Sequence, residues 1–417
     1  MKKKFFYIFS AFIVVIGTLL VFTNNTLASD DLDYYNKTFS QIKKDANKYE
    51  KDSFLLFDCL YDKDAESIDA YSLFSYIREK GYNAYYVTLK DSDIYNKLKE
   101  NNNFENIIVI SEYSKVDGKK FIKEIIKILP KTKAIITSFG TESIIDKYFH
   151  ELDYLKYIFI QHGQIFFKES VFNSGYLFKE KFPYILASSE IESSIFKKHG
   201  WNDENILKAG LPRWDLLKQN KLTDEEKSIF IMFTWRLTNP YRFTQSLYFK
   251  RLYSLLKNKE FHDFLQKNNI KVYLALHHAL KTNSNINLNI DIDNIEIVDT
   301  QKISHYIKKS SLLITDLSSI CFDFMFQNKP VIFYGLDRGD KLLERNQFID
   351  LEMLKKREHI FPNIVFDENM LIEKVKYYVN RNFILENETA NVYSNFFYIK
   401  ENIREKLFDE INRIISN

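Results

Sequence analysis

The sequence predicts an α/β protein in which two doubly wound, Rossmann-like domains face each other across a cleft, with an apolar helix at the N-terminus. Its 417 residues are too many for one typical hydrophobic core. From about Ser53 onward, short apolar strands alternate with amphipathic helices, which is typical of a parallel sheet covered on both faces. A second set of strands begins near Lys227, after the polar stretch KQNKLTDEEK, the best linker candidate. We therefore expect domains at residues 29–222 and 223–385.

Composition and charge limit the class of protein. Hydrophobic residues make up 45% and charged residues 28% of the chain, as in a folded globular protein. The net charge is only +3 because 59 basic side chains are balanced by 56 acidic ones, so no nucleic-acid partner is expected. Cys59 and Cys321 are the two cysteines, and both lie in apolar contexts. We expect them to be buried thiols rather than a disulfide or metal ligands.

Residues 1–28 form an apolar N-terminal segment. MKKK precedes FFYIFSAFIVVIGTLLVFT, an uncharged run of about the length that spans a bilayer. The lysines favour an N-terminus in the cytosol. The remainder would then lie outside, either anchored or released after a site such as TLA|SD, unless the helix only attaches the protein to the membrane surface. The sequence thus predicts membrane contact or targeting and leaves the sidedness open.

The predicted strands and helices follow one another in a regular order. The first half has strands at FLLFDCL, NAYYVTL, NIIVIS, KAIITSF, YIFIQHG and YILASS, with helices at DAYSLFSYIREKG and KKFIKEIIKILP. The second half has strands at SIFIMFTW, KVYLALHH, IEIVD, SLLITD, PVIFYG and NIVFD. Within residues 386–417, NVYSNFFYIKENIREKLFDEINRII has apolar residues near helical spacing. It predicts one long helix that, by analogy with other two-lobed folds, packs back on the first domain.

Polar residues at strand ends are the candidate site, because open α/β sheets bind ligands beyond the carboxyl ends of their strands. In YIFIQHGQ, His162 is a candidate general base and Gly163 permits close approach of a substrate. A histidine in this place can also be a structural hydrogen-bonding residue. In KAGLPRWDLL, Arg213 offers a fork of donors for a phosphate. Alternatively, Arg213 pairs with Asp215 in a structural turn.

The second half presents further polar strand ends. Thr234 and Arg236 end the strand in MFTWR, and His277 and His278 end the next one in LALHHAL. Because side chains alternate along a strand, only one of the two histidines is expected to face the cleft.

The stretch LLITDLSSICFDFMF passes from a strand into a helix through Thr315, Asp316, Ser318 and Ser319. Such side chains cap helix N-termini, where free N–H groups and the helix dipole also favour a phosphate. An ordinary cap without a ligand would have the same sequence, so the stretch alone leaves both interpretations open.

Several other kinds of site are not indicated. No Gly-x-Gly-x-x-Gly follows the first strand and no Gly-x-Ser-x-Gly is present. Asp291 and Asp293 lie in an Asn-rich loop before a strand, where solvated turn residues are expected rather than metal ligands. We therefore expect neither a cofactor nor a metal.

The order of the motifs carries a family resemblance. His-Gly after a strand is followed by GLPRWDLL, TWR, a strand-end histidine and ITDLSSICFDFMFQNKPVIFY, and YDKDAESIDAYSLFSYIREKGYNAYYV precedes them. From about Phe54 to Phe366 the chain resembles the CDP-glycerol glycerophosphotransferase family, which includes teichoic-acid primases and polymerases. The resemblance implies a GT-B fold and transfer of glycerol phosphate from CDP-glycerol to a hydroxyl of a lipid-linked or polymeric polyol-phosphate acceptor, with release of CMP. It also implies a membrane-associated enzyme whose catalytic part faces the cytoplasm.

The resemblance also implies roles for particular residues. His162 would be the general base, and His277, Ser318, Ser319 and Arg213 would hold the pyrophosphate of the donor. Asp316 would position its loop rather than touch an anion, because like charges repel. The remaining substrate-binding candidates are Gly163, Asp215, Thr234, Arg236 and Thr315.

The chain departs from the family pattern at a few positions. Gln161 stands where the family commonly has Trp, QIFFKES replaces Thr-Pro-Leu-Lys with Lys168 at a different spacing, and Ala275 replaces Arg or Lys. These departures bear on the acceptor side and on the donor phosphates. CDP-ribitol or a nucleotide sugar is therefore an alternative donor, and an exported non-catalytic protein is the alternative if residues 1–28 are cleaved.

Overall fold

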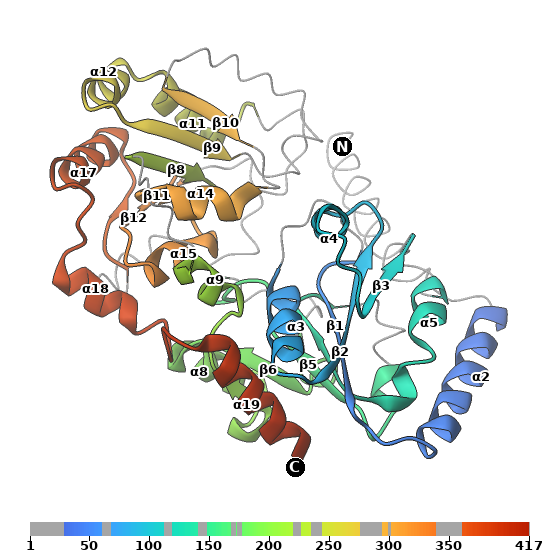
Figure 1. Ribbon diagram of the computed structural model, residues 1–417. Coiled ribbons are helices and arrows are strands. Elements are labelled where there is room, and N and C mark those ends of the chain that lie inside the picture. The colour runs from blue at the N-terminus through green and yellow to red at the C-terminus, as the bar shows by residue number, and fades with distance from the viewer. Residues whose placement is uncertain are drawn as a thin grey trace, which may run out of the picture.

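The protein has two lobes, each built on a parallel β-sheet (Figure 1). The computed structural model describes residues 29–60, 68–111, 119–140, 148–167, 172, 177–219, 227–234, 244–275, 294–298, 302–338 and 361–416.

The first lobe contains a seven-stranded sheet with the order β3-β2-β1-β4-β5-β6-β7, in which all neighbours are parallel. Its central strands, β1 (Ser53–Phe57) and β4 (Thr132–Thr137), are almost entirely buried. Such burial on both faces is typical of parallel sheets flanked by helices. The other strands are β2 (Asn83–Leu89), β3 (Ile107–Ile110), β5 (Lys156–Phe159), β6 (Tyr184–Ala187) and β7 (Ile206–Lys208).

Helices cover both faces of this sheet. Figure 1 shows α3 (Asp69–Glu79) on one face and α2 (Ser29–Ala46) with α5 (Lys119–Ile125) on the other. Ser92 and Ser189 cap the N-termini of the next two helices by accepting hydrogen bonds from backbone N–H groups. These are α4 (Asp93–Glu100) and α8 (Glu190–Lys198), and α9 (Arg213–Gln219) follows β7.

The second lobe contains a six-stranded parallel sheet with the order β10-β9-β8-β11-β12-β13. Its strands are β8 (Ser228–Met232), β9 (Lys271–Ala275), β10 (Ile295–Val298), β11 (Leu312–Thr315), β12 (Val331–Tyr334) and β13 (Ile364–Val365). Its helices are α11 (Leu247–Lys257), α12 (Lys259–Lys267), α14 (Ile303–Lys309), α15 (Ile320–Phe326) and α17 (Glu368–Asn380). Both lobes thus have the Rossmann strand order, and the doubly wound prediction is confirmed.

Two elements differ from the sequence prediction. The expected single C-terminal helix is wrong, because the structure has two, α18 (Asn387–Ser394) and α19 (Ile403–Ser416). The first packs near α15 in the second lobe, whereas α19 returns to the first lobe, where the ring of Phe408 lies 5.5 Å from that of Phe54 (Figure 1). Strand β7 was not predicted, since three residues are too few to show a strand pattern.

One hydrophobic core passes through both lobes. It includes Phe54 in β1, Trp214 in α9 and Phe333 in β12. Several aromatic pairs cross between the lobes. Among them, the rings of Phe167 and Phe322 lie 5.5 Å apart and those of Trp214 and Phe326 4.9 Å apart. The lobes are therefore held together by continuous apolar packing on one side of the molecule.

The described residues, which do not include 1–28, contain no helix that is both long and apolar enough to cross a bilayer.

Candidate functional site

Each sheet has one point where its strand order reverses, between β1 and β4 in the first lobe and between β8 and β11 in the second. Open α/β sheets bind ligands beyond the carboxyl ends of the strands at such points. A buried carboxylate bridges each of them. Asp58, directly after β1, accepts a hydrogen bond from the hydroxyl of Ser138, directly after β4. Asp316, directly after β11, accepts from the N–H and the hydroxyl of Thr234 at 2.8 and 2.9 Å.

His162 lies just beyond β5, next to the end of β4. Its half-buried imidazole stacks on Phe139, with ring centroids 4.1 Å apart, and its Nδ1 lies 3.3 Å from the carbonyl oxygen of Ser138. Gln161 precedes it with φ +59°, a left-handed conformation that is uncommon for residues other than glycine. The chain therefore turns sharply after β5 and places the predicted base against the end of the neighbouring strand.

Gly163 brings the two lobes into contact at the predicted site. A Cβ placed on Gly163 would lie 2.6 Å from the Oγ of Ser319, which is closer than real Cβ atoms approach. Ser319 directly precedes α15 and makes no side-chain cap bond to that helix. A larger residue at position 163 would force Ser319 to shift where the His-Gly turn of the first lobe meets the Asp-Leu-Ser-Ser turn of the second.

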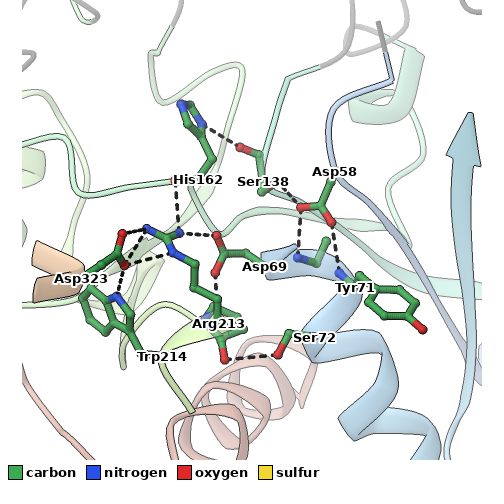
Figure 2. A network of polar contacts seen from close by, with 11 residues as sticks. Asp58, Asp69, Tyr71, Ser72, Ser138, His162, Arg213, Trp214 and Asp323 are labelled. Carbon is green, nitrogen blue, oxygen red and sulfur yellow. Dashed lines mark hydrogen bonds and ion pairs between the residues drawn. The ribbon is translucent and has the colours of Figure 1, made fainter. Parts of the chain in front are cut away.

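Arg213 occupies the centre of a buried ion-pair network that joins the lobes (Figure 2). Its Nη1 lies 2.5 Å from a carboxylate oxygen of Asp69 in α3, and its Nε and Nη2 donate to Asp323 in α15 at 3.1 and 3.2 Å. Nη1 also donates to the carbonyl of His162 at 3.2 Å, and the indole of Trp214 donates to Asp323 at 2.7 Å. Arg213 was predicted to donate to a phosphate. In this structure its hydrogen bonds go to the carboxylates of Asp69 and Asp323 and to a backbone carbonyl.

The network holds two carboxylates against one guanidinium. Burial raises the pKa of Asp69 to about 6, although the charge of Arg213 acts in the opposite direction. The side chain of Arg213 is 13% exposed and that of Asp69 is fully buried. The ion pairs connect α9 with α3 and α15, and the bond from Nη1 to the carbonyl of His162 adds the His-Gly turn to the same network.

Asp215 lies two positions after Arg213 in sequence but has a different partner. Its carboxylate accepts hydrogen bonds from the N–H groups of Ile403 and Arg404 at 3.1 and 2.9 Å, and the Nε of Arg404 lies 3.4 Å from it. These N–H groups open α19, so Asp215 caps that helix from another part of the chain. This placement separates it from the residues around His162 and Ser319.

Five of the predicted residues of the second lobe are described, and they lie at the carboxyl ends of β8 and β11: Thr234, Thr315, Asp316, Ser318 and Ser319. Besides the contact between Asp316 and Thr234, the hydroxyl of Thr315 donates to the carbonyl of Met232 at 2.6 Å. Ser318 and Ser319 follow and are half-buried. The predicted residues Arg236 and His277, as well as Lys168, Asp291 and Asp293, lie outside the described residues. Within the described part of the chain, no three His, Cys, Asp or Glu side chains gather as metal ligands would.

Sequence reasoning missed the acidic residues that hold the site together. Glu192 is fully buried and accepts hydrogen bonds from the N–H groups of Ile165 and Ser188 at 2.9 and 2.8 Å. Burial raises its pKa, and these two N–H groups partly offset the rise. Asp323 gave a visible signal, because it is a charged residue within the apolar run ICFDFMF. Asp58 gave a similar signal, because it is a charged residue within the apolar run FLLFDCL.

Comparison with known proteins identifies the family. The family described as CDP-Glycerol:Poly(glycerophosphate) glycerophosphotransferase matches residues 44–412. The chain belongs to this glycerophosphotransferase family. The predicted resemblance is therefore confirmed over nearly the whole chain.

Relatives of this glycerophosphotransferase family member include teichoic-acid proteins. It is 27% identical over 380 residues to the minor teichoic acid biosynthesis protein GgaB of Bacillus subtilis (strain 168), covering 85% of this chain and 39% of that protein. It is 29% identical over 165 residues to the teichoic acid glycerol-phosphate primase of the same organism, covering 37% of this chain and 40% of the primase. The chain thus spans about two fifths of the length of these relatives.

Solved structures support the fold of this family member. The wall teichoic acid polymerase TagF matches with a TM-score of 0.61 and 17% identity, covering 92% of this chain and 95% of that one. A TagF H444N variant soaked with CDPG matches with a TM-score of 0.59 and 16% identity, covering 92% and 94%. The predicted GT-B arrangement of two parallel sheets is confirmed.

Proposed function

We propose that this protein transfers glycerol phosphate from CDP-glycerol to a hydroxyl of a lipid-linked or polymeric polyol-phosphate acceptor and releases CMP, in the synthesis of a teichoic-acid or capsule-like polymer. The observation that carries the proposal is the contact between the two lobes at Gly163 and Ser319. It brings a histidine of one lobe next to the serine-rich strand end of the other. The family membership supports the class of donor.

The reaction divides between the lobes. In the first lobe, His162 takes the proton of the acceptor hydroxyl as that oxygen attacks the phosphorus next to glycerol. A new O–P bond forms, the bond from this phosphorus to the bridging oxygen breaks, and CMP leaves with that oxygen. Phosphoryl transfer depends on positioning and charge stabilisation more than on covalent catalysis, so holding the two substrates in line is the main task of the protein.

The second lobe holds the donor in this proposal. Ser318, Ser319 and His277 bind the pyrophosphate, with hydroxyl and imidazole groups as hydrogen-bond donors. Asp316 does not contact the anion. Its bonds to Thr234 keep the ends of β8 and β11 together beneath the donor site. Arg213 acts between the lobes through Asp69 and Asp323 rather than on the phosphate.

CDP-ribitol is the second donor to test. The relatives include a teichoic acid ribitol-phosphate polymerase of Staphylococcus aureus (strain NCTC 8325 / PS 47), 23% identical over 216 residues, which covers 47% of this chain and 41% of that protein. Gln161 and Ala275 differ from the family pattern near the acceptor and the donor phosphates. Both features leave the choice between glycerol and ribitol to experiment.

We also propose that residues 1–28 attach the enzyme to the membrane with both lobes in the cytoplasm. The lysines of MKKK and the apolar run after them support attachment to the membrane surface, which keeps the N-terminus and both lobes on the same side. Nucleotide-activated donors are made in the cytosol, so a donor site requires this side. Protease treatment of sealed right-side-out vesicles tests the orientation. We expect both lobes to be protected, and their digestion would contradict the proposal.

The activity test uses the full chain purified in detergent. We expect CMP release from CDP-glycerol with a lipid-linked glycerol-phosphate acceptor, and a loss of about two orders of magnitude or more in His162→Ala. His199→Ala is the matched control, because that half-buried imidazole also stacks on a phenylalanine of the first lobe, at 3.9 Å from Phe172, but at the end of α8. It should retain the turnover of the wild type.

Calorimetry on the same sample separates a wrong acceptor from a wrong function. We expect CDP-glycerol or CDP-ribitol to bind even where no acceptor is turned over. A folded wild-type protein that binds neither of these donors nor CMP would contradict the donor site, and the exported non-catalytic protein would then be the better explanation.

A further inference from the structure

A chain of hydrogen bonds joins the buried carboxylate of Asp58 to the imidazole of His162. Asp58 accepts from the hydroxyl of Ser138, and the carbonyl of the same Ser138 lies 3.3 Å from Nδ1 of His162 (Figure 2). Ser138 is fully buried, and its N–H donates to the carbonyl of Phe57 at 3.4 Å. The carbonyl that meets the imidazole is thus held by bonds to the end of β1.

Asp58 is itself fixed by several donors. It accepts hydrogen bonds from the N–H groups of Ala70 and Tyr71 at 3.1 Å and from the hydroxyl of Tyr86 at 2.9 Å. The two N–H groups open α3, whose own N-cap residue, Ile68, has no side-chain oxygen. Burial and the nearby carboxylate raise the pKa of Tyr86 well above its ordinary value, so the phenol keeps its proton and donates.

The contact with Ser138 determines which nitrogen of His162 acts as the base. A carbonyl oxygen only accepts, so the hydrogen in this contact is on Nδ1, and the lone pair of the neutral ring is on Nε2. The stacking on Phe139, with an angle of 13° between the rings, fixes the plane of the imidazole. A ring flip within that plane would replace Nδ1 by a C–H group and lose the hydrogen bond.

We propose that Asp58 and Ser138 are positioning residues that hold His162 as its Nδ1–H tautomer, with Nε2 directed at the acceptor hydroxyl. The side chain of a free histidine in water prefers the opposite tautomer, with the hydrogen on Nε2, so the protein must impose this one. The role of Nε2 rests on the proposed function, whereas the tautomer and its cause depend only on the geometry of the first lobe.

Ser138→Ala in the full chain tests the proposal by turnover. It removes the hydroxyl that ties residue 138 to Asp58, so the carbonyl facing His162 loses this support, while the described donors from Ala70, Tyr71 and Tyr86 still reach Asp58. We expect kcat to fall about tenfold or more, as part of the rate that a positioned base supplies, with an unchanged KM for CDP-glycerol. Ser138→Thr, which restores a hydroxyl, should recover most of the loss.

Ser53→Ala is the matched control for this test. Ser53 is also fully buried and lies at the opposite end of β1, where its hydroxyl donates to the carbonyl of Lys131 at 3.1 Å. It should lose a similar amount of stability and keep its kcat. An equal fall of kcat in both variants would attribute the effect to general destabilisation and overturn the proposal.

Nitrogen-15 NMR of labelled histidines tests the tautomer without any substrate. The His162 signals, assigned by their loss in His162→Gln, should show Nδ1–H in the wild type and a shift toward Nε2–H in Ser138→Ala. A wild type with Nε2–H, or a Ser138→Ala protein that keeps Nδ1–H, overturns the proposal whatever its turnover. Absence of turnover with every donor would contradict the proposed function alone, and the tautomer result would still decide this inference.

Discussion

Asp69 is a fully buried carboxylate that shares its only guanidinium in the network, that of Arg213, with Asp323. Burial raises its pKa from 3.8 to about 6, against the effect of Arg213. The folded protein therefore binds this proton more tightly than the unfolded chain does. The resulting stabilisation is fully present below about pH 4 and is lost as the pH rises through about 6.

Asp69→Asn should reveal this dependence, because the amide cannot titrate. Between pH 5 and pH 7.5, the unfolding free energy of the wild type should fall relative to that of the variant by about 1 kcal/mol. Urea unfolding of both proteins at the two pH values measures the difference, and the titration of groups that do not interact with residue 69 cancels. A difference that is the same at both pH values would mean that Asp69 stays ionised throughout this range.

Among the elements, α19 depends on a residue that is far away in sequence. Asn402, which precedes it, has φ +52°, so the chain cannot continue a helix through that position. The first N–H groups of α19 are satisfied by the carboxylate of Asp215 in α9. The helix then packs against α3 and β7 of the first lobe.

Asp215→Ala should destabilise the protein by about 1–2 kcal/mol, the usual effect of removing a helix cap, while turnover per folded molecule stays constant. Urea unfolding and CMP release measure the two quantities. Asn258→Ala is a suitable control, since Asn258 caps α12 by accepting from the N–H of Phe261 at 3.0 Å. A raised KM for the donor with unchanged stability would instead support the substrate contact that the sequence analysis assigned to Asp215.

The elements of this fold were largely predictable because parallel strands buried on both faces give continuous apolar runs. LLIT and VIFY are such runs, and both are strands. The break between α18 and α19 was not predictable in the same way. Phe396 and Phe397 continue the apolar pattern through the break, but they pack on Phe361 and Trp214 rather than forming a helix face. Apolar spacing therefore indicated burial without indicating conformation.

At the scale of the whole molecule, Arg213 and Asp323 form a polar link between the lobes inside a largely apolar interface. Asp323 accepts from Arg213 and from the indole of Trp214 at 2.7 Å. Without Asp323, Arg213 would still pair with Asp69, but its buried Nε and Nη2 and the indole N–H of Trp214 would lose their acceptor. Buried donors without an acceptor destabilise a fold more than the loss of an exposed pair does.

Asp323→Ala should therefore lower the unfolding free energy by about 3 kcal/mol or more, because three buried donors lose their acceptor. Glu401→Ala is the matched control, because the pair of Glu401 with Lys218 also involves α9 but is exposed, with an N–O distance of 3.3 Å. Its loss should change stability by less than about 1 kcal/mol. Unfolding in urea compares the two, and equal losses would contradict a special role for the buried pair.

The candidate site was predictable only where its chemistry follows a strand end. His162, Gly163 and Ser319 were found in this way, and the structure brings them together. The residues that hold these side chains in place could not be predicted from the sequence. Asp58, for example, acts through Ser138, which lies 80 positions later in the chain. Arg213 illustrates the same limit. Its residue type suits a phosphate, but only the folded chain shows that two carboxylates already surround it.

The return of α19 to the first lobe has a consequence for the order in which the protein is made. The ring of Phe408 covers that of Phe54, a residue in the first strand of the sheet. While a ribosome synthesises the chain from Lys208 to Ile403, every strand of the first sheet has been made, but α19, which packs on α3 and β7, has not. We expect the nascent first lobe to be prone to aggregation and sensitive to protease over that whole interval. It should become compact only when the second lobe has emerged.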